Sequence, residues 1–315
     1  MKKYFVLILA MICASVASCS FKADSDLTMS DWMMELPDST PMCKISIPAT
    51  HDSGALYGKL VGTQTQDIDI PQQLESGIRG FDIRLSVTGL GKKLGVYHGM
   101  IYQHATWEDD VLPAFISFLK EHPTETIVVS MKCEGGDVGE YEELLEQSLQ
   151  NSANSAYFVK DFSEDMTLGD CRGKILFLHR TKAGDDYPGV LCMGWADNAT
   201  FELEMIAADG KKATASIEDV YSHEDDSHSI EKAELTYEHM KSAMQAPADT
   251  YKWYISYASA TCLPKTFPKD FSDKINPWLA DKTRGMKGAC GIVFLDFAGS
   301  DDCKEVIVNL IMSNK

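Results

Sequence analysis

Short runs of strand-forming residues recur from Lys44 onward, and most are separated by stretches with helical periodicity. One run, 126–132 (TIVVSMK), is an uninterrupted apolar segment of the kind found in buried parallel strands. The expected strands are 44–47, 78–85, 94–98, 126–132, 174–180, 214–221, 251–259 and 291–297. The expected helices are 72–76, 107–121, 141–149, 230–244 and 303–312. Parallel strands need crossover connections, so this alternation predicts an α/β fold, an irregular (β/α)8 barrel in a single domain.

Residues 1–19 have the layout of a secretory signal, with Lys2 and Lys3, an apolar run over 4–12 and then small residues. The segment VASC resembles a lipobox, in which Cys19 is lipidated, and an ordinary cleavage site is the alternative. Either interpretation predicts an exported protein, lipid-anchored at a bacterial cell envelope or otherwise secreted. We expect a polar tether over 20–40 and the barrel over 41–315.

The formal charge is −18 at pH 7, because 47 acidic residues outnumber 29 basic ones. Such a surface repels nucleic acid at long range, so no nucleic-acid partner is expected. Of the nine cysteines, Cys13 and Cys19 belong to the leader. The others are scattered without C-x-x-C spacing, which argues against a zinc site, and their pairing cannot be deduced from the sequence.

Polar residues cluster where the expected strands end. In a parallel barrel those ends meet at one mouth, where catalytic groups gather. The residues concerned are His51, Asp52, Asp82, Arg84, His98, Lys132, Arg180, Asp219, Tyr221 and Asp296. Each has a structural alternative when taken alone, such as a satisfied histidine or an exposed ion pair. Together they predict a site with two imidazoles, several carboxylates and three cations.

Two histidines and an arginine suit the cleavage of a phosphodiester by a hydroxyl of the same molecule. One imidazole takes the proton of the attacking hydroxyl, and the other protonates the leaving oxygen. A guanidinium stabilises the charge on the phosphoryl oxygens. With the arginine in the cation's place this chemistry needs no metal, and we expect no metal and no cofactor.

These residues stand in motifs that resemble the bacterial phosphatidylinositol-specific phospholipases C. The early motifs are THDSG, RGFDIRL, YHG and HPTETIVVSMK, in that order along the chain. KILFLHR, GWADN over 194–198, IEDVY over 217–221 and FLDF continue the resemblance, which spans about 42–297. It implies an irregular TIM barrel that cleaves phosphatidylinositol into diacylglycerol and inositol 1,2-cyclic phosphate.

The resemblance also implies a role for each strand-end residue. His51 matches the general base, oriented by Asp296, and His98 matches the general acid, assisted by Asp52. Arg84 matches the arginine that stabilises the phosphate. Asp82 is expected to support Arg84 or a histidine. Residues that match inositol-ring contacts are Lys132, Arg180, Asp219 and Tyr221.

Two other functions remain open from the sequence. A glycerophosphodiester phosphodiesterase uses a similar barrel but needs carboxylates around a divalent metal, against which Arg84 argues. A binding module for inositol phosphates or inositol glycans needs the ring-binding residues but not the two histidines. The sequence does not separate phosphatidylinositol from glycosyl-phosphatidylinositol as substrate. We expect a monomer in peripheral contact with a membrane, with Trp107 and Trp278 as candidate inserting aromatics.

Overall fold

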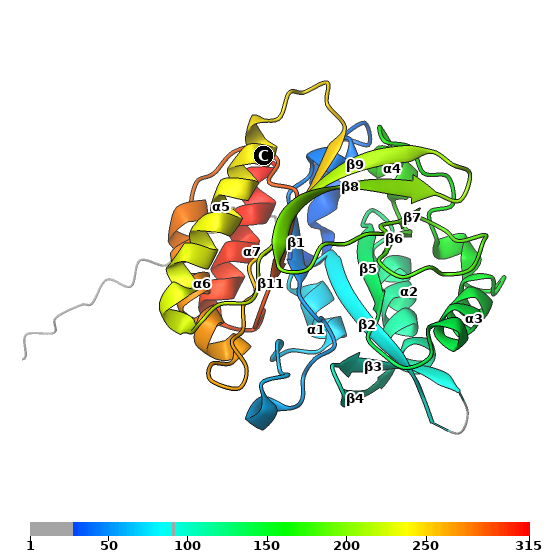
Figure 1. The fold of residues 1–315 in the computed structure, drawn as a ribbon. Helices are drawn as coiled ribbons and strands as arrows, with labels where there is room; N and C mark the ends of the chain where they lie inside the picture. Colours follow the sequence, from blue (N-terminus) through cyan, green and yellow to red (C-terminus); the bar gives the residue numbers. More distant parts are fainter. Residues whose placement is uncertain (1–27, 90–91) are drawn as a thin grey trace, which may run out of the picture.

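A closed barrel forms the body of the protein in the computed structural model, which describes residues 28–89 and 92–315 (Figure 1). The strands are β1 (Ile47–Thr50), β2 (Gly80–Thr88), β3 (Lys93–His98), β4 (Ile101–Thr106), β5 (Ile127–Cys133), β6 (Ile175–His179), β7 (Val190–Leu191), β8 (Ala199–Ala207), β9 (Lys212–Asp219), β10 (Lys252–Tyr257) and β11 (Ile292–Leu295). The sheet order is β1-β11-β10-β9-β8-β7-β6-β5-β2, and pairing of β1 with β2 closes the ring. The expected irregular α/β barrel is therefore confirmed.

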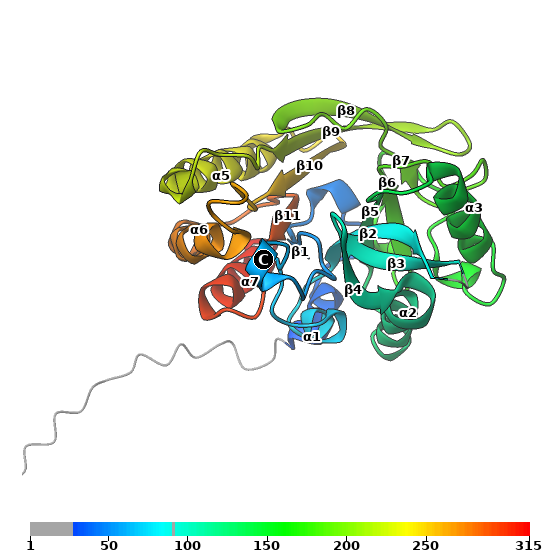
Figure 2. The ribbon, with the colours of Figure 1, turned by 60° about the horizontal axis from the view of Figure 1, so that its bottom comes forward.

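The helices lie outside the ring of strands. They are α1 (Ile70–Glu75), α2 (Leu112–Glu121), α3 (Val138–Leu149), α4 (Leu168–Cys171), α5 (Ser229–Gln245), α6 (Pro268–Thr283) and α7 (Asp301–Ser313). Short helical turns are η1 (Met29–Glu35), η2 (Met42–Lys44), η3 (Lys59–Val61), η4 (Trp107–Val111), η5 (Ser155–Tyr157) and η6 (Asp226–His228). α5, α6 and α7 cover one side of the barrel, and α2 and α3 cover the other (Figure 2). Among the described residues, no helix is long and apolar enough to cross a membrane.

The burial of the parallel strands explains why they stand out in the sequence as apolar runs. Every residue of β1, β6 and β11 is buried, as parallel strands covered by helices require. Parallel pairing holds from β9 through β10, β11, β1, β2 and β5 to β6. The C-terminal ends of these strands therefore point to one mouth.

Two expected strands are wrong, and several elements were missed. The first strand is Ile47–Thr50 rather than 44–47, because Met42–Lys44 form the turn η2. The run 94–98 is not a barrel strand, because β3 pairs antiparallel with the extended end of β2 and lies outside the ring. β8 was missed because its outer face is exposed, so Glu202 and Glu204 interrupt its apolar pattern. α6 was missed because Pro277 lies inside it.

The expected tether over 20–40 is wrong for its second half. Trp32 and Met33 in η1 are buried, and Trp32 Nε1 donates to the Gly77 carbonyl at 3.0 Å. Two adjacent apolar residues can therefore anchor a segment whose average composition is polar. The leader expected over 1–19, including Cys19, lies outside the described residues.

A buried ion pair joins η1 to the base of the barrel. Arg79, directly before β2, donates from Nε to Glu125 Oε2 at 2.8 Å, and both side chains are fully buried. The same guanidinium donates to the Ser30 carbonyl at 2.7 Å, and Glu125 accepts from the Met33 amide at 3.1 Å. A buried charge is tolerated only when it is paired and fully hydrogen-bonded, and these contacts meet that condition.

We expect Glu125→Gln to lower the free energy of unfolding by about 3 to 5 kcal/mol, because it leaves the buried charge of Arg79 uncompensated. The measurement is urea unfolding. The exposed helical pair Lys269 and Asp273 provides the control, and Asp273→Asn should cost less than about 0.5 kcal/mol. Equal losses in the two variants would contradict this account of the barrel base.

Candidate active site

The loop after β1 turns sharply, which places His51 and Asp52 at the barrel mouth. Ser53 Oγ donates to the Thr50 carbonyl at 2.8 Å, so a serine hydroxyl closes the turn directly after the strand. The Asp82 amide donates to the same hydroxyl oxygen at 2.9 Å and fixes the turn against β2. Asp52 adopts a positive φ of 41° within it. The motif THDSG is thus a strand end followed by a hydroxyl-stabilised turn.

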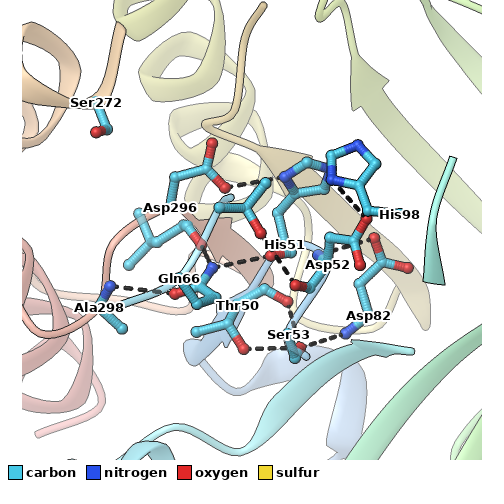
Figure 3. Close-up of polar contacts among 12 residues, drawn as sticks. Thr50, His51, Asp52, Ser53, Gln66, Asp82, His98, Ser272, Asp296 and Ala298 are labelled. Atoms are coloured by element: carbon cyan, nitrogen blue, oxygen red, sulfur yellow. Dashed lines mark hydrogen bonds and ion pairs between the residues drawn. The ribbon is translucent and has the colours of Figure 1, made fainter. Parts of the chain in front are cut away.

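His51 and Asp296 form a dyad between the ends of β1 and β11 (Figure 3). His51 Nδ1 lies 2.9 Å from Asp296 Oδ1, and His51 Nε2 lies 2.8 Å from Arg84 Nη2. Arginine can only donate, so Nε2 must accept and Nδ1 carries the proton. The neutral ring therefore presents its basic nitrogen on the Arg84 side.

Burial and the adjacent Arg84 guanidinium hold the pKa of His51 well below its ordinary value. The ring is therefore unprotonated at neutral pH. A histidine in this state can accept a proton, which is the property that a general base requires.

His98 and Asp52 form a second pair beside the first. His98 Nδ1 donates to the Thr63 carbonyl at 2.8 Å and lies 3.3 Å from Asp52 Oδ2. The two imidazole centroids are 6.3 Å apart. Because Nδ1 is committed to these acceptors, Nε2 is the nitrogen of His98 available for proton transfer to a ligand.

Arg84 links the two histidine pairs. Its Nη2 donates to Asp82 Oδ2 at 2.9 Å, and its Nη1 lies 3.6 Å from Asp52 Oδ2. Burial alone would raise the pKa of Asp82, but the Arg84 and Arg180 guanidinium groups outweigh it and lower that pKa. Asp82 is therefore ionised and holds Arg84 in place.

A cavity of about 600 Å³ opens in front of these groups. Its lining includes the residues expected to bind a ring, namely Lys132, Arg180, Asp219 and Tyr221. Two contacts that the sequence did not predict organise this side. The Arg180 guanidinium lies 4.0 Å from the Trp195 ring centroid, and Trp195 Nε1 donates to Asp219 Oδ2 at 2.9 Å.

Glu134 and Asp197 also belong to this lining. Glu134 Oε2 lies 3.0 Å from Lys132 Nζ, and Tyr221 donates its hydroxyl to Asp197 Oδ1 at 2.7 Å. Glu134 was not predicted, although it follows Lys132 by two residues and an extended chain places both side chains on the same side. Asp197 and Trp195 lie in GWADN, a motif whose individual residues had no assigned role.

Several polar atoms of the cavity have no hydrogen-bond partner among the described residues. They include the donors Arg180 Nε and Nη1 and, just behind the cavity wall, the acceptor Asp82 Oδ1, which lies 3.9 Å from Arg180 Nη1. Buried polar groups are normally paired, so such atoms point to a ligand that supplies partners. A ring carrying several hydroxyl groups provides donors and acceptors at once, and it fits this mixed set.

The structure brings all ten predicted strand-end residues to one mouth. His98 reaches it by an unexpected route, because β3 runs back along β2 and Val96 pairs with Leu85. Asp82 contacts Arg84, one of the two partners expected for it. The residue roles themselves remain predictions.

The seven cysteines of the described part are Cys43, Cys133, Cys171, Cys192, Cys262, Cys290 and Cys303, and all have free thiols. In the same part of the chain, no group of three or more histidine, cysteine, aspartate or glutamate side chains has metal-ligand geometry.

Residues 38–181 match the model of the family described as phosphatidylinositol-specific phospholipase C, X domain. The chain is 29% identical over 304 residues to a 1-phosphatidylinositol phosphodiesterase of Listeria monocytogenes, covering 92% of this chain and 87% of the relative. It is 28% identical to the enzyme of that name from Staphylococcus aureus strain Newman, over 90% of this chain and 94% of the relative.

Solved structures agree with these sequence matches. A structure of the Staphylococcus aureus phosphatidylinositol-specific phospholipase C superposes with a TM-score of 0.80 at 26% identity, covering 91% of this chain and 98% of that one. The Listeria monocytogenes phosphatidylinositol-specific phospholipase C gives 0.70 at 27% identity, covering 92% and 100%. The chain thus carries a match to the X domain and resembles bacterial phosphatidylinositol-specific phospholipases C over about nine-tenths of its length.

The X-domain match contains His51, Asp52, Arg84 and His98, so one contiguous part of this chain carries both imidazoles and the guanidinium. Asp296 lies far outside the match and reaches His51 only because β11 pairs with β1. The resemblance to bacterial phosphatidylinositol-specific phospholipases C that the four early motifs indicated is therefore confirmed.

Activity should fall as the pH drops below about 6. Burial raises the pKa of Asp52 to about 6, so this carboxylate becomes neutral below that pH and no longer stabilises a cationic His98. The measurement is the pH profile of kcat/KM for a water-soluble inositol phosphodiester. In Asp52→Asn, overall activity should be lower and the acid-side decline should move to lower pH. An unchanged acid limb in that variant would contradict the assignment to Asp52.

Proposed function

We propose that this protein is a metal-independent phosphatidylinositol-specific phospholipase C. It cleaves phosphatidylinositol, free or within a glycosyl-phosphatidylinositol, to diacylglycerol and inositol 1,2-cyclic phosphate. The observation that carries the proposal is the placement of Arg84 between two imidazoles, each with its own carboxylate, at the edge of a polar cavity. The known names of the relatives support the same reaction class.

The first half of the reaction is proton removal and ring closure. The inositol 2-hydroxyl replaces the Arg84 N–H as the partner of His51 Nε2 and gives its proton to that nitrogen. Its oxygen then forms the new bond to phosphorus. Asp296 accepts from Nδ1 throughout and stabilises the imidazolium that forms.

The second half is departure of the diacylglycerol oxygen. His98 transfers a proton from Nε2 to this oxygen as its bond to phosphorus breaks, and Asp52 supports the charged ring beforehand. Arg84, released from His51, donates to the phosphoryl oxygens where negative charge accumulates. Asp82 keeps the guanidinium aligned during this exchange.

The cavity side opposite the histidines binds the inositol ring in this account. Arg180, Asp219 and Lys132 offer hydrogen bonds to ring hydroxyls, and Tyr221 provides an aromatic wall. The unpaired atoms of Arg180 gain partners when the ring enters. A ligand that forms hydrogen bonds with these buried polar groups gains affinity, and the requirement for such bonds makes the site selective for a polyol.

His51→Ala and His98→Ala should each lower kcat by a factor of about 100 or more, because each removes one proton-transfer group. His122 gives a matched control, since its Nδ1 lies 2.8 Å from Asp31 Oδ1 in a comparable pair at the barrel base. His122→Ala should retain wild-type turnover. Full activity of His51→Ala or His98→Ala on phosphatidylinositol vesicles would overturn the proposal. If the wild-type protein binds inositol phosphate but cleaves no phosphatidylinositol, the binding-module alternative is favoured.

We further propose that an apolar rim beside the mouth contacts the lipid surface. The rim consists of Leu60 and Val61 of η3, Met100 after β3 and Leu263, which lines the cavity. Leu60 and Met100 are 92% and 94% exposed, although exposure of large apolar groups costs free energy in water. Large side chains exposed together at a site entrance are typical of interaction surfaces.

The two tryptophans expected to insert into the membrane are not part of this rim. Trp107 is fully buried, and its Nε1 donates to Ser148 Oγ at 2.9 Å. Trp278 is half-buried and packs edge-on against Tyr237. Their aromatic character alone could not reveal this, because the same residue type also serves as core.

The double variant Leu60→Asp/Met100→Asp should bind phosphatidylinositol-containing vesicles at least roughly 10-fold more weakly, since burying one such side chain contributes about 1.5 to 3 kcal/mol. Vesicle cosedimentation measures the change. Turnover of a water-soluble substrate should remain at the wild-type level. Met34 is 56% exposed on η1 at the barrel base, and Met34→Asp is the control. Unchanged vesicle binding by the double variant would exclude the rim as the membrane contact.

We also propose that the protein is exported and anchored through a lipidated Cys19. The proposal rests on the leader sequence alone, with its two lysines, apolar run and VASC segment. An anchor would keep the mouth near a lipid surface despite the acidic net charge of −18.

A further inference from the structure

Gln66 lies between the ends of the two strands that carry the His51–Asp296 dyad. The side chain is fully buried, and Figure 3 shows its carboxamide between the backbone of His51 and that of Ala298. The sequence does not draw attention to this residue, because TQTQD contains no charged pair or strand pattern around it.

The carboxamide makes three hydrogen bonds, all to the backbone where these two strands end. Nε2 donates to the His51 carbonyl at 2.8 Å and to the Leu295 carbonyl at 2.9 Å. Oε1 accepts from the Ala298 amide at 3.2 Å. A side-chain amide has the same donor and acceptor groups as a peptide unit. Gln66 therefore extends the ladder between β1 and β11 beyond its last backbone bond, from the His51 amide to the Leu295 carbonyl.

The extension matters because both strands leave the sheet through strained residues. Asp52 has φ 41° and Phe297 has φ 54°, and neither is a glycine. Such conformations are strained for residues that carry a Cβ, and they persist only where surrounding contacts enforce them. Gln66 binds the carbonyl directly before Asp52 and the amide directly after Phe297.

The neighbouring residue reinforces the same arrangement. Thr65 Oγ1 donates to the Asp52 carbonyl at 3.0 Å, and the Thr65 carbonyl accepts from the Phe297 amide at 2.8 Å. Residues 65 and 66 thus fix the backbone that follows His51 and the backbone on both sides of Asp296. The separation of these two side chains depends on that backbone, because each extends from a strand end.

We propose that Gln66 is a positioning residue that holds His51 Nδ1 against Asp296 Oδ1 by tying together the ends of β1 and β11. The residue does not touch the substrate. Its catalytic effect rests on the function proposed above, whereas its effect on the dyad geometry does not.

The test is Gln66→Met, which keeps the side-chain length and removes all three hydrogen bonds. We expect kcat on a water-soluble inositol phosphodiester to fall roughly 10- to 100-fold, because small displacements of a catalytic group carry losses of that order. KM should stay near its wild-type value, since the inositol-binding side of the cavity is unchanged.

Asn314→Leu is the matched control at the opposite end of β1. Asn314 Oδ1 accepts from the Ser46 amide at 2.8 Å, and its Nδ2 donates to the Ser46 carbonyl at 3.0 Å. This variant also removes amide bonds to the β1 backbone, so it should lower Tm without lowering kcat. Parallel losses of kcat in both variants would show that Gln66 acts only through global stability and would overturn the proposal.

A second readout is independent of turnover. The His51 Nδ1 proton, donated to a carboxylate, gives a downfield resonance in proton NMR of ¹⁵N-histidine-labelled protein. We expect Gln66→Met to shift or broaden it and Asn314→Leu to leave it unchanged. An unaltered resonance together with wild-type kcat would overturn the proposal. If the resonance moves but even the wild-type protein cleaves no phosphatidylinositol, the positioning role stands and the proposed function fails.

Gln66→Glu provides a second variant if the methionine variant does not fold. It keeps the acceptor for the Ala298 amide but places an oxygen opposite the His51 and Leu295 carbonyls, where Nε2 donates in the wild type. We expect the same change in the His51 resonance, and its absence would overturn the proposal.

Discussion

The site depends on one cation, the guanidinium of Arg84, whose side chain is only 13% exposed. A charge at this depth is stable only with ionised partners, and Asp82 and Asp52 supply them. The same guanidinium sets the tautomer of His51, because its donor leaves Nε2 as the only acceptor of that ring. One residue of β2 therefore helps to lower the pKa of Asp82 and determines the nitrogen of His51 on which proton transfer takes place.

Two arginines of the β2 segment, the fully buried Arg79 and the largely buried Arg84, show how the fold divides stability from chemistry. Arg79 at the base bonds to Glu125 and to backbone carbonyls, in a closed set of contacts. Arg84 at the mouth instead shares its donors with a histidine that must exchange partners during reaction. The mouth also keeps unpaired atoms of Arg180 and strained residues such as Asp52. Contacts at the base stabilise the fold, so the mouth can retain strained residues and unpaired polar atoms that a ligand would pair.

The sequence predicted the barrel because β5, β6 and β11 are largely buried, which produces apolar runs that need no tertiary information. It also predicted the mouth residues, because a parallel barrel gathers its strand ends. It could not predict β8, where one exposed face introduces charges, or the antiparallel direction of β3. Gln66 and Trp195 were not predictable either, since their importance lies in contacts with distant strands rather than in local pattern.

The central claim is that a hydroxyl of the substrate, not water, attacks phosphorus while Arg84 serves in place of a metal. Phosphorus NMR of the protein with phosphatidylinositol micelles in excess chelator tests this most directly. The account predicts that inositol 1,2-cyclic phosphate appears first. A non-cyclic phosphate as the first product, or turnover that returns only when a divalent metal is added, would contradict it.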